Sequence, residues 1–292
     1  EKRWFASAFD MSPTKVHYAG QLLPITPEPQ IYRTADGVKF GIEICEDIWS
    51  PIPPSSVLTL DGAEIIFNLS ASTEQIGKHS YLEALLAQQS ARTLSAYVYS
   101  SCGFGESTQD VVFGGNAFVY ENGVQLASAK RFQMESQVVI CDIDIEKLRS
   151  ERRLNTTFVN AQHNLFVLPV GSGTYEKKYI DCMPKENAER EFVLNRNIAP
   201  QPFLQGETID AACEEAFNIQ VTGLAKRLLH IKCKTVVLGI SGGLDSTLAL
   251  LVCIEAFDRL KFDRKDILAV TMPGFGTSDR THNNALLLMQ EL

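Results

Sequence analysis

Short apolar runs recur along the first half of the chain. Runs of this length are typical of strands buried inside a sheet. We expect strands at 38–44, 63–69, 96–100, 116–120 and 137–143. Between the second and the third, residues 81–94 carry apolar side chains at helical spacing, which predicts a helix. Strands that alternate with helices favour an α/β layered fold.

The pattern changes after residue 170. Residues 171–208 carry glycine, charged and proline-containing stretches, so we interpret them as a linker or docking segment. An amphipathic helix is expected at 209–230, with one apolar stripe made of Ile209, Cys213, Phe217, Leu224 and Leu228. The chain is therefore predicted to contain one domain at 1–170 and a second at 209–292, joined by 171–208.

Composition narrows the class of protein. The chain has 292 residues, 45% of them hydrophobic and 21% charged, as in ordinary globular proteins. Its net charge of −8 and the lack of a basic cluster argue against nucleic-acid binding. No apolar run is long enough to span a bilayer. Seven scattered cysteines without a C-x-x-C pair argue against structural zinc and indicate a cytoplasmic location.

One turn in the second domain indicates a phosphate site. The apolar run 236–240 predicts a strand, 247–257 predicts a helix, and S-G-G-L-D-S connects them. Two glycines allow a ligand to approach the backbone closely, and the N-terminus of the helix favours an anion. Asp245 would repel a phosphate unless Mg²⁺ lay between them. A glycine-rich turn with Ser or Asp as a simple helix cap remains the alternative. It is not a Walker loop, since Gly-Lys-Ser/Thr is missing.

This turn resembles the signature loop of the N-type ATP pyrophosphatases, which activate carbonyl or carboxyl groups with ATP. A second segment, M-P-G-F-G-T-S-D-R-T, follows the predicted strand 266–272 and is similar to a loop of the glutamine-dependent NAD synthetases. Its alternative is an ordinary turn capped by Ser278 or Asp279. The resemblance implies that Asp245 holds Mg²⁺. It also implies that ATP and pyrophosphate are bound by Gly239, Ile240, Ser241, Gly242, Gly243, Leu244, Asp245, Ser246 and Met272.

In the first domain, Cys45 comes directly after the strand 38–44. Glu46 and Asp47 suit the first turn of a helix, and such a turn presents a nucleophile beside free backbone N–H groups. Core packing is the alternative for this cysteine. The segment G-I-E-I-C-E-D-I-W resembles the nucleophile segment of the nitrilase superfamily, and specifically the glutaminase domain of the NAD synthetases. That resemblance implies that Ser72 and Lys78 help to bind glutamine; a cap and a solvated cation are their alternatives.

The resemblance covers nearly the whole chain. It implies a nitrilase-like αββα layered sandwich, followed by the start of a parallel α/β ATP pyrophosphatase domain of the adenine nucleotide α-hydrolase type. The implied substrates are glutamine, ATP with Mg²⁺, and deamido-NAD, with no bound organic cofactor and no zinc. The family also implies a homo-oligomer without a nucleic-acid or membrane partner.

Two functional groups of the family find no counterpart here. Nitrilase chemistry needs a glutamate base and a lysine beside the cysteine, and neither role matches a residue of this sequence. In the family both precede the segment that opens this chain, and the chain ends at Leu292 in an apolar helical run without a stop signal. We therefore expect the chain to be truncated at both ends, and residues 1–292 alone to be inactive. Two other readings remain open: an amidotransferase with another carboxylate acceptor, and a non-catalytic assembly module.

Overall fold

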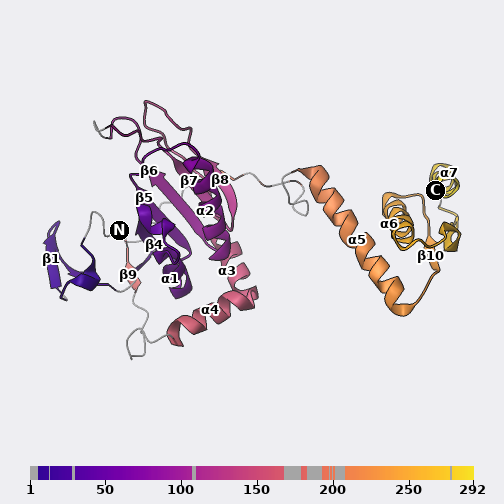
Figure 1. The fold of residues 1–292 in the computed structure, drawn as a ribbon, viewed down its shortest axis with the longest axis horizontal. Helices are drawn as coiled ribbons and strands as arrows, with labels where there is room; N and C mark the ends of the chain where they lie inside the picture. Colours follow the sequence, from indigo (N-terminus) through magenta and orange to yellow (C-terminus); the bar gives the residue numbers. More distant parts are fainter. Residues whose placement is uncertain are drawn as a thin grey trace. The chain divides into compact units, whose positions relative to one another are not determined.

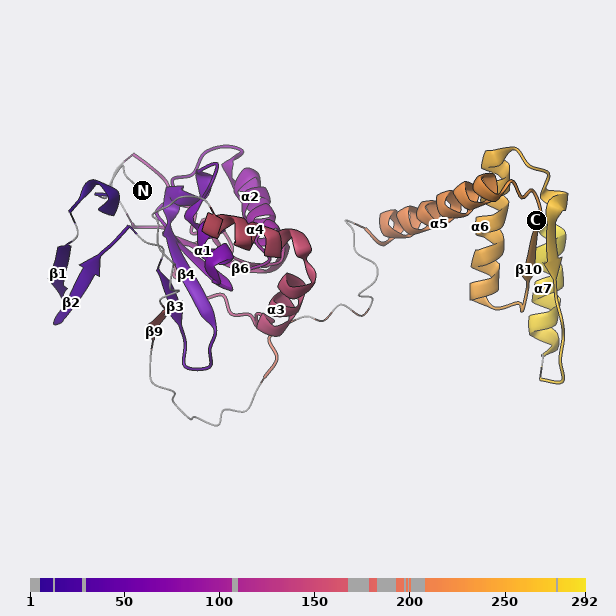
Figure 2. The same ribbon diagram turned by 90° about the horizontal axis from the view of Figure 1, so that it is seen from below.

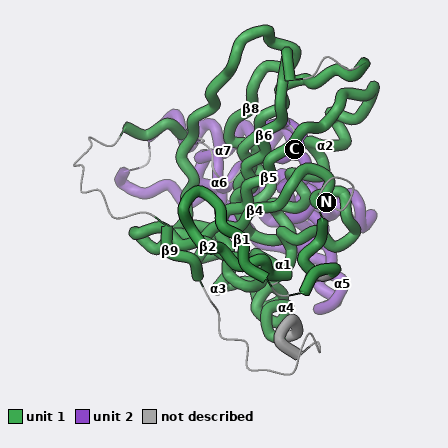
Figure 3. Tube along the Cα trace, turned by 90° about the vertical axis from the view of Figure 1, so that its left-hand side faces the viewer, with its two compact units in different colours: residues 1–197 green, residues 198–292 purple. Residues whose placement is uncertain are grey.

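The computed structural model describes residues 6–12, 14–27, 30–106, 110–167, 179–182, 193–196, 198, 200, 208–276 and 278–292. The chain divides into two compact units, residues 1–197 and 198–292, which Figure 3 distinguishes by colour. Both units combine helices and strands, so the predicted α/β class is confirmed. The predicted boundaries at residues 170 and 208 stay predictions. Most of the predicted linker lies outside the described residues, although Tyr179–Asp181 within it forms a strand (β9).

Unit 1 is organised around a seven-stranded mixed sheet with the order β8-β7-β6-β5-β4-β3-β9. Its three central strands, β4 (Lys39–Ile44), β5 (Ile65–Ser70) and β6 (Ala96–Ser101), are parallel neighbours. On one side follow the antiparallel strands β7 (Ala117–Glu121) and β8 (Val124–Ser128). On the other side lie β3 (Ile31–Arg33) and β9. A separate antiparallel hairpin joins β1 (Thr14–Tyr18) to β2 (Gln21–Ile25).

Helices α1 (Pro54–Asp61) and α2 (Lys78–Arg92) cover one face of this sheet (Figure 1). Leu58 of α1 and Leu86 of α2 are buried against Ile66, Tyr97 and Phe118 of the strands. On the opposite face, by contrast, the side chains of Ile42 and Leu69 are 41% and 57% exposed. The packed core of unit 1 therefore lies on the face that carries the alternate residues of β4, β5 and β6.

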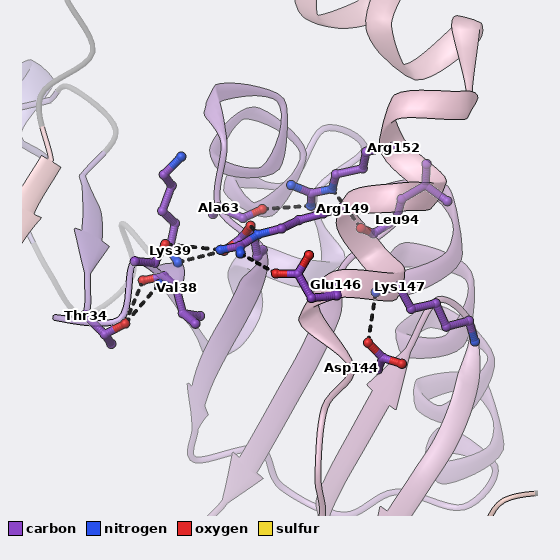
Figure 4. A network of polar contacts seen from close by, with 12 residues as sticks. Thr34, Val38, Lys39, Ala63, Leu94, Asp144, Glu146, Lys147, Arg149 and Arg152 are labelled. Atoms are coloured by element: carbon purple, nitrogen blue, oxygen red, sulfur yellow. Dashed lines mark hydrogen bonds and ion pairs between the residues drawn. The ribbon is translucent and has the colours of Figure 1, made fainter. Parts of the chain in front are cut away.

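Helices α3 (Ile145–Leu154) and α4 (Thr156–Val167) continue the chain at one end of the sheet. Arg149 of α3 forms an ion pair with Glu64 at 2.6 Å. Figure 4 shows Arg152 of the same helix, which donates to the carbonyl oxygens of Ala63 and Leu94. Burial lowers the pKa of Arg152 to about 10. These contacts hold α3 against the segments that lead into β5 and β6, the ends opposite to Cys45.

The described part of unit 2 contains two parallel strands, β10 (Val236–Gly239) and β11 (Ile267–Val270), and three α-helices. The helices are α5 (Ile209–Ile231), α6 (Leu244–Leu260) and α7 (Asp279–Glu291). Figure 2 shows α6 and α7 beside β10, whereas α5 packs against α6. Leu250 of α6 and Ala285 of α7 pack with Leu238 and Ile267. The other face of the strands carries Val237, which is 69% exposed.

Two expectations about these elements are wrong. Residues 137–143 form no strand, because β8 already occupies the place beside β7 and the Gln137 side chain bonds both backbone groups of Lys130 instead. The turn at Asn122–Gly123 thus connects β7 to β8. The apolar stripe of α5 begins later than expected: Val221 and Leu228 are buried, whereas Ile209 and Cys213 are exposed. None of the helices within the described ranges is long and apolar enough to cross a membrane.

Candidate functional site

Cys45 stands where β4 ends and the 3₁₀ helix Cys45–Trp49 begins. Its φ of +47° places it in the left-handed region, which a residue with a Cβ seldom occupies. The turn is stabilised by Asp47, whose Oδ2 accepts a 2.8 Å hydrogen bond from the Ile44 N–H. A strained turn of this kind lifts one side chain clear of the strand, as a nucleophile requires.

The cysteine lines a cavity of about 1190 Å³ at the carboxyl edge of the parallel strands. Ser72 and Lys78, the two residues expected to bind glutamine, line the same cavity. The structure thus brings together three side chains that lie as many as 33 residues apart in the sequence (Cys45 and Lys78). Their chemical roles stay predictions.

Lys78 is held in place by its neighbours. Its Nζ donates to the Thr73 carbonyl at 2.8 Å and lies 5.7 Å from the centre of the Trp49 ring, which stacks on Tyr81. The ammonium group retains two further donors, enough to bind a carboxylate in the cavity. Ser72 is fixed through its backbone, because its N–H donates to Ser101 Oγ at 3.2 Å.

Sequence reasoning missed several residues of this cavity. Cys102 lines it as a second thiol, and burial raises the pKa of that thiol. Trp49 and Ser101 also line it. The signal that could have found Cys102 and Ser101 is their place at the end of β6, since the carboxyl ends of parallel strands meet at one edge.

The second candidate site is the turn between β10 and α6, in unit 2. Gly242 adopts φ +83°, and Gly243 is the N-cap of α6. Ser241 N–H donates to Ser246 Oγ at 3.2 Å, so the two hydroxyl-bearing residues fold towards each other around the turn. Asp245 is exposed in the first turn of the helix. A helix N-terminus with exposed hydroxyls and small residues suits a phosphate group.

The N-terminus of a second helix, α7, follows the neighbouring strand β11. Ser278 is the N-cap of α7, one of the two caps named in the alternative interpretation of this segment, and its Oγ accepts from the Thr281 N–H at 3.3 Å. A Cβ added to Gly242 would lie 2.0 Å from the Thr281 carbonyl oxygen, so this turn packs directly on α7. Met272, which follows β11, is 80% exposed. Gly239 and Ile240 lie at the end of β10, and Ile240 is buried in the core.

We expect Gly242→Ala to destabilise unit 2. The substitution places a Cβ in the left-handed region, at about 1–2 kcal/mol, and adds the overlap with Thr281. For a domain of this size, such a cost lowers the midpoint of thermal unfolding by at least about 4–8 °C. Gly223→Ala in α5 is the control, because nothing lies within 4 Å of its added Cβ. Equal melting curves for the two variants would contradict the packing described here.

A divalent cation fits the second site only with help from a ligand. Within the described ranges, no three His, Cys, Asp or Glu side chains are grouped to hold a metal ion. Mg²⁺ commonly uses one or two carboxylates and completes its shell with water and substrate phosphates. A single carboxylate such as Asp245 is therefore compatible with a cation that arrives with a nucleotide.

Comparison with known proteins connects both sites to families. Residues 8–153 match the model of the carbon–nitrogen hydrolases, and residues 217–292 match that of NAD synthase. A glutamine-dependent NAD(+) synthetase of Mycobacterium leprae is 40% identical over 90% of this chain, and one of Thermotoga maritima is 27% identical over 87%. The chain spans 38% and 40% of the length of these relatives. A solved glutamine-dependent NAD+ synthetase of Acinetobacter baumannii, in complex with ADP, aligns with 98% of this chain and 39% of its own. Its identity is 21% and its TM-score 0.37, too low to support an argument.

Proposed function

The chain belongs to the carbon–nitrogen hydrolase family, and from this premise we propose that it serves glutamine-dependent synthesis of NAD+. One observation carries the proposal: a cysteine at a strained strand end, inside a cavity with a serine and a lysine, shares a chain with an S-G-G-L-D-S phosphate turn. The first site suits the release of ammonia from an amide. The second suits the activation of a carboxylate by ATP. The match of residues 217–292 to NAD synthase supports nicotinate adenine dinucleotide as the acceptor.

In the first half-reaction, the Cys45 thiolate attacks the side-chain amide carbon of glutamine. Lys78 and Ser72 hold the polar head of the amino acid, where a cation suits its α-carboxylate. Ammonia leaves with a proton, and water then hydrolyses the thioester to glutamate. We assign the general base and the oxyanion lysine of the family to no residue of this chain.

In the second half-reaction, the nicotinate carboxylate attacks the α-phosphate of ATP. The N–H groups and hydroxyls of the 241–246 turn hold the departing pyrophosphate. Asp245 is the residue that would hold Mg²⁺, which would supply positive charge against the negative charge of the phosphates. The resulting acyl-adenylate reacts with ammonia, which displaces AMP. Ammonia must remain neutral to react, so we expect it to travel by an enclosed path.

The test uses a protein of the relatives' full length that contains residues 1–292, called the full-length enzyme below. It is incubated with ATP, Mg²⁺, deamido-NAD and glutamine labelled with ¹⁵N in the side-chain amide. Mass spectrometry should find ¹⁵N in the carboxamide of NAD+, with one AMP and one pyrophosphate formed per NAD+. Glutamate release without NAD+, in the presence of another carboxylate that becomes amidated, would favour the alternative amidotransferase.

Lys78 offers a specific test of glutamine binding. We expect Lys78→Met to raise the KM for glutamine by about 10- to 100-fold, the effect of losing a hydrogen bond between charged groups. Synthesis with ammonium as the nitrogen source should keep its rate. Lys130→Met, which removes an exposed lysine outside the cavity, is the matched control. A lower rate with ammonium as well would show that Lys78 supports the fold instead.

The cysteines and the exposed apolar residues bear on the compartment and the oligomeric state of the enzyme. All seven cysteines are free thiols, which supports a reducing, cytoplasmic compartment. We propose a homo-oligomer, consistent with apolar residues that each unit leaves exposed, such as Leu69 and Val237. Size-exclusion chromatography with light scattering on the full-length enzyme would test this, and a monomer at assay concentration would contradict it.

A further inference from the structure

The backbone of Cys45 is held by a buried side chain, that of Asn68 on the neighbouring strand β5. Asn68 Oδ1 accepts from the Cys45 N–H at 3.1 Å, and its Nδ2 donates to the Cys45 carbonyl oxygen at 3.3 Å. The regular pairing of β4 with β5 ends one residue earlier, at Ile44 and Leu69. The amide therefore takes the place of the peptide group that a continued strand would have offered.

The orientation of this amide is fixed by two further hydrogen bonds. Ser70 Oγ donates to Asn68 Oδ1 at 2.7 Å, and Nδ2 donates to the Tyr97 hydroxyl at 3.1 Å. Both lone pairs and both protons of the amide are thus used, which is its full capacity. The Asn68 side chain is completely buried, so bulk water does not compete for these hydrogen bonds.

A second layer holds Tyr97. Its hydroxyl donates to Glu43, and Glu43 Oε2 accepts from the Ser55 N–H at 2.7 Å in the first turn of α1. Glu43 and Tyr97 are 2% and 0% exposed, and burial raises the pKa of both groups. The chain of contacts runs from the N-terminus of α1 through the carboxyl group, the phenol and the amide to Cys45. Such a buried and fully satisfied network is rigid.

We propose that Asn68 is a positioning residue, which keeps Cys45 in its left-handed conformation and so directs the thiol into the cavity, with Tyr97 fixing the amide. A non-glycine residue at φ +47° costs about 1–2 kcal/mol, and it persists only where its surroundings fix it. Of the described contacts, those from Asn68 bond both backbone polar groups of Cys45. The catalytic consequence rests on the proposed function of Cys45 as the glutaminase nucleophile.

The main variant is Asn68→Asp in the full-length enzyme. The carboxylate keeps the acceptor for the Cys45 N–H but loses the donor to its carbonyl oxygen. We expect kcat for glutamine hydrolysis to fall about 100-fold, the effect of misplacing a reacting group by about 1 Å. The KM for glutamine should change less than about two-fold, since Ser72 and Lys78 are untouched. A variant that keeps its fold, by circular dichroism, and its kcat would overturn the proposal.

The pH dependence separates positioning from simple loss of folded protein. When the carboxyl group introduced by Asn68→Asp is protonated, it regains a donor, and burial favours that neutral form. The ratio of the variant's kcat to the wild-type kcat, per folded molecule, should therefore rise as the pH is lowered from about 8 to about 6. A ratio that stays constant over this range would count against positioning by the Nδ2 donor.

If Asn68→Asp does not fold, a pair of tyrosine variants tests the same proposal. Tyr97→Phe removes the hydroxyl that fixes the amide, whereas Tyr120→Phe removes the hydroxyl of the residue paired with it on β7. The Tyr120 hydroxyl donates to Gln125, outside the network. We expect kcat to fall about 10-fold for Tyr97→Phe and less than two-fold for Tyr120→Phe. Equal values in the two variants would overturn the proposal.

Alkylation tests the positioning without any assumption about the reaction. Iodoacetamide labelling of Cys45 is followed by peptide mass spectrometry and divided by the labelling of Cys213, an exposed thiol in the other unit. This ratio should fall several-fold in Asn68→Asp and Tyr97→Phe, but not in Tyr120→Phe. If the wild-type enzyme releases no glutamate while the ratio falls as expected, the proposed function fails and the positioning role stands. An unchanged ratio overturns the positioning role.

Discussion

Cys45→Ala should abolish NAD+ formation from glutamine and leave NAD+ formation from ammonium intact. Without the thiol, no acyl-enzyme forms, and removing a nucleophile of this type costs about six powers of ten in kcat. In the proposed function the second half-reaction uses the 241–246 turn of unit 2, whereas the residues that line the Cys45 cavity belong to unit 1. The measurement is the rate of NAD+ formation by the full-length enzyme at saturating glutamine and, separately, at saturating ammonium.

Cys102→Ala is the matched control, because Cys102 is the other thiol that lines the cavity. Its glutamine-supported rate should fall by at most about 200-fold, the upper end of what one small group in the wall of a pocket contributes. Equal losses with both nitrogen sources in Cys45→Ala would show that this residue supports the fold. Equal losses in both cysteine variants with glutamine alone would leave the nucleophile unassigned.

The strands of the central sheet were predictable because their signal is local. Residues 38–44, 63–69 and 96–100 are apolar runs bounded by polar or glycine-containing segments, and they coincide with β4, β5 and β6 within two residues. The S-G-G-L-D-S turn between a strand and a helix was predictable for the same reason, since strand, turn and helix follow one another within 236–260. In each case the residues that determine the structure are neighbours in the sequence.

The expectation for 137–143 failed because strand formation also requires a partner. Val138 and Ile140 are apolar, yet they are 84% and 72% exposed, since the hairpin return at Val124–Ser128 pairs with β7. That return strand has a weaker pattern, V-Q-L-A-S, but the tight turn at Asn122–Gly123 places it directly beside β7. Proximity in the chain therefore outweighed hydrophobicity.

The sequence predicted only some residues of the candidate site. Cys45, Ser72 and Lys78 were identified through resemblance to a family, and the cavity brings them together. Asn68 was not identified, because inside an apolar run its amide gives no indication of a partner 23 residues earlier. A polar residue within a buried strand is nevertheless a signal, because burial without hydrogen bonds would be costly. Which partner satisfies it depends on strand register, and the sequence alone does not specify that register.

Asp245→Ala should abolish NAD+ formation with either nitrogen source while glutamine hydrolysis continues. The carboxylate lies in the first turn of α6, beside the turn that would bind pyrophosphate, where alone it would repel the phosphates. A cation between them reverses that repulsion, so losing the carboxylate removes stabilisation that grows as pyrophosphate departs. We expect a loss of about 10³-fold in the rate of synthesis, the magnitude of removing one electrostatic stabiliser. The assay measures AMP and NAD+ together, with ammonium as the nitrogen source.

Asp266→Ala provides the comparison, because Asp266 is an exposed carboxylate of the same unit that precedes β11, away from the turn. It should keep at least about half of the wild-type rate, as surface substitutions usually change little. A weakened Mg²⁺ bridge also predicts that Asp245→Ala requires more Mg²⁺ for half-maximal synthesis, whereas Asp266→Ala does not. If Asp245→Ala retained synthesis from ammonium at normal Mg²⁺, the carboxylate would not hold the ion. Its role would then be limited to a favourable charge at the N-terminus of α6. The turn would then have to hold pyrophosphate through its N–H groups and hydroxyls alone.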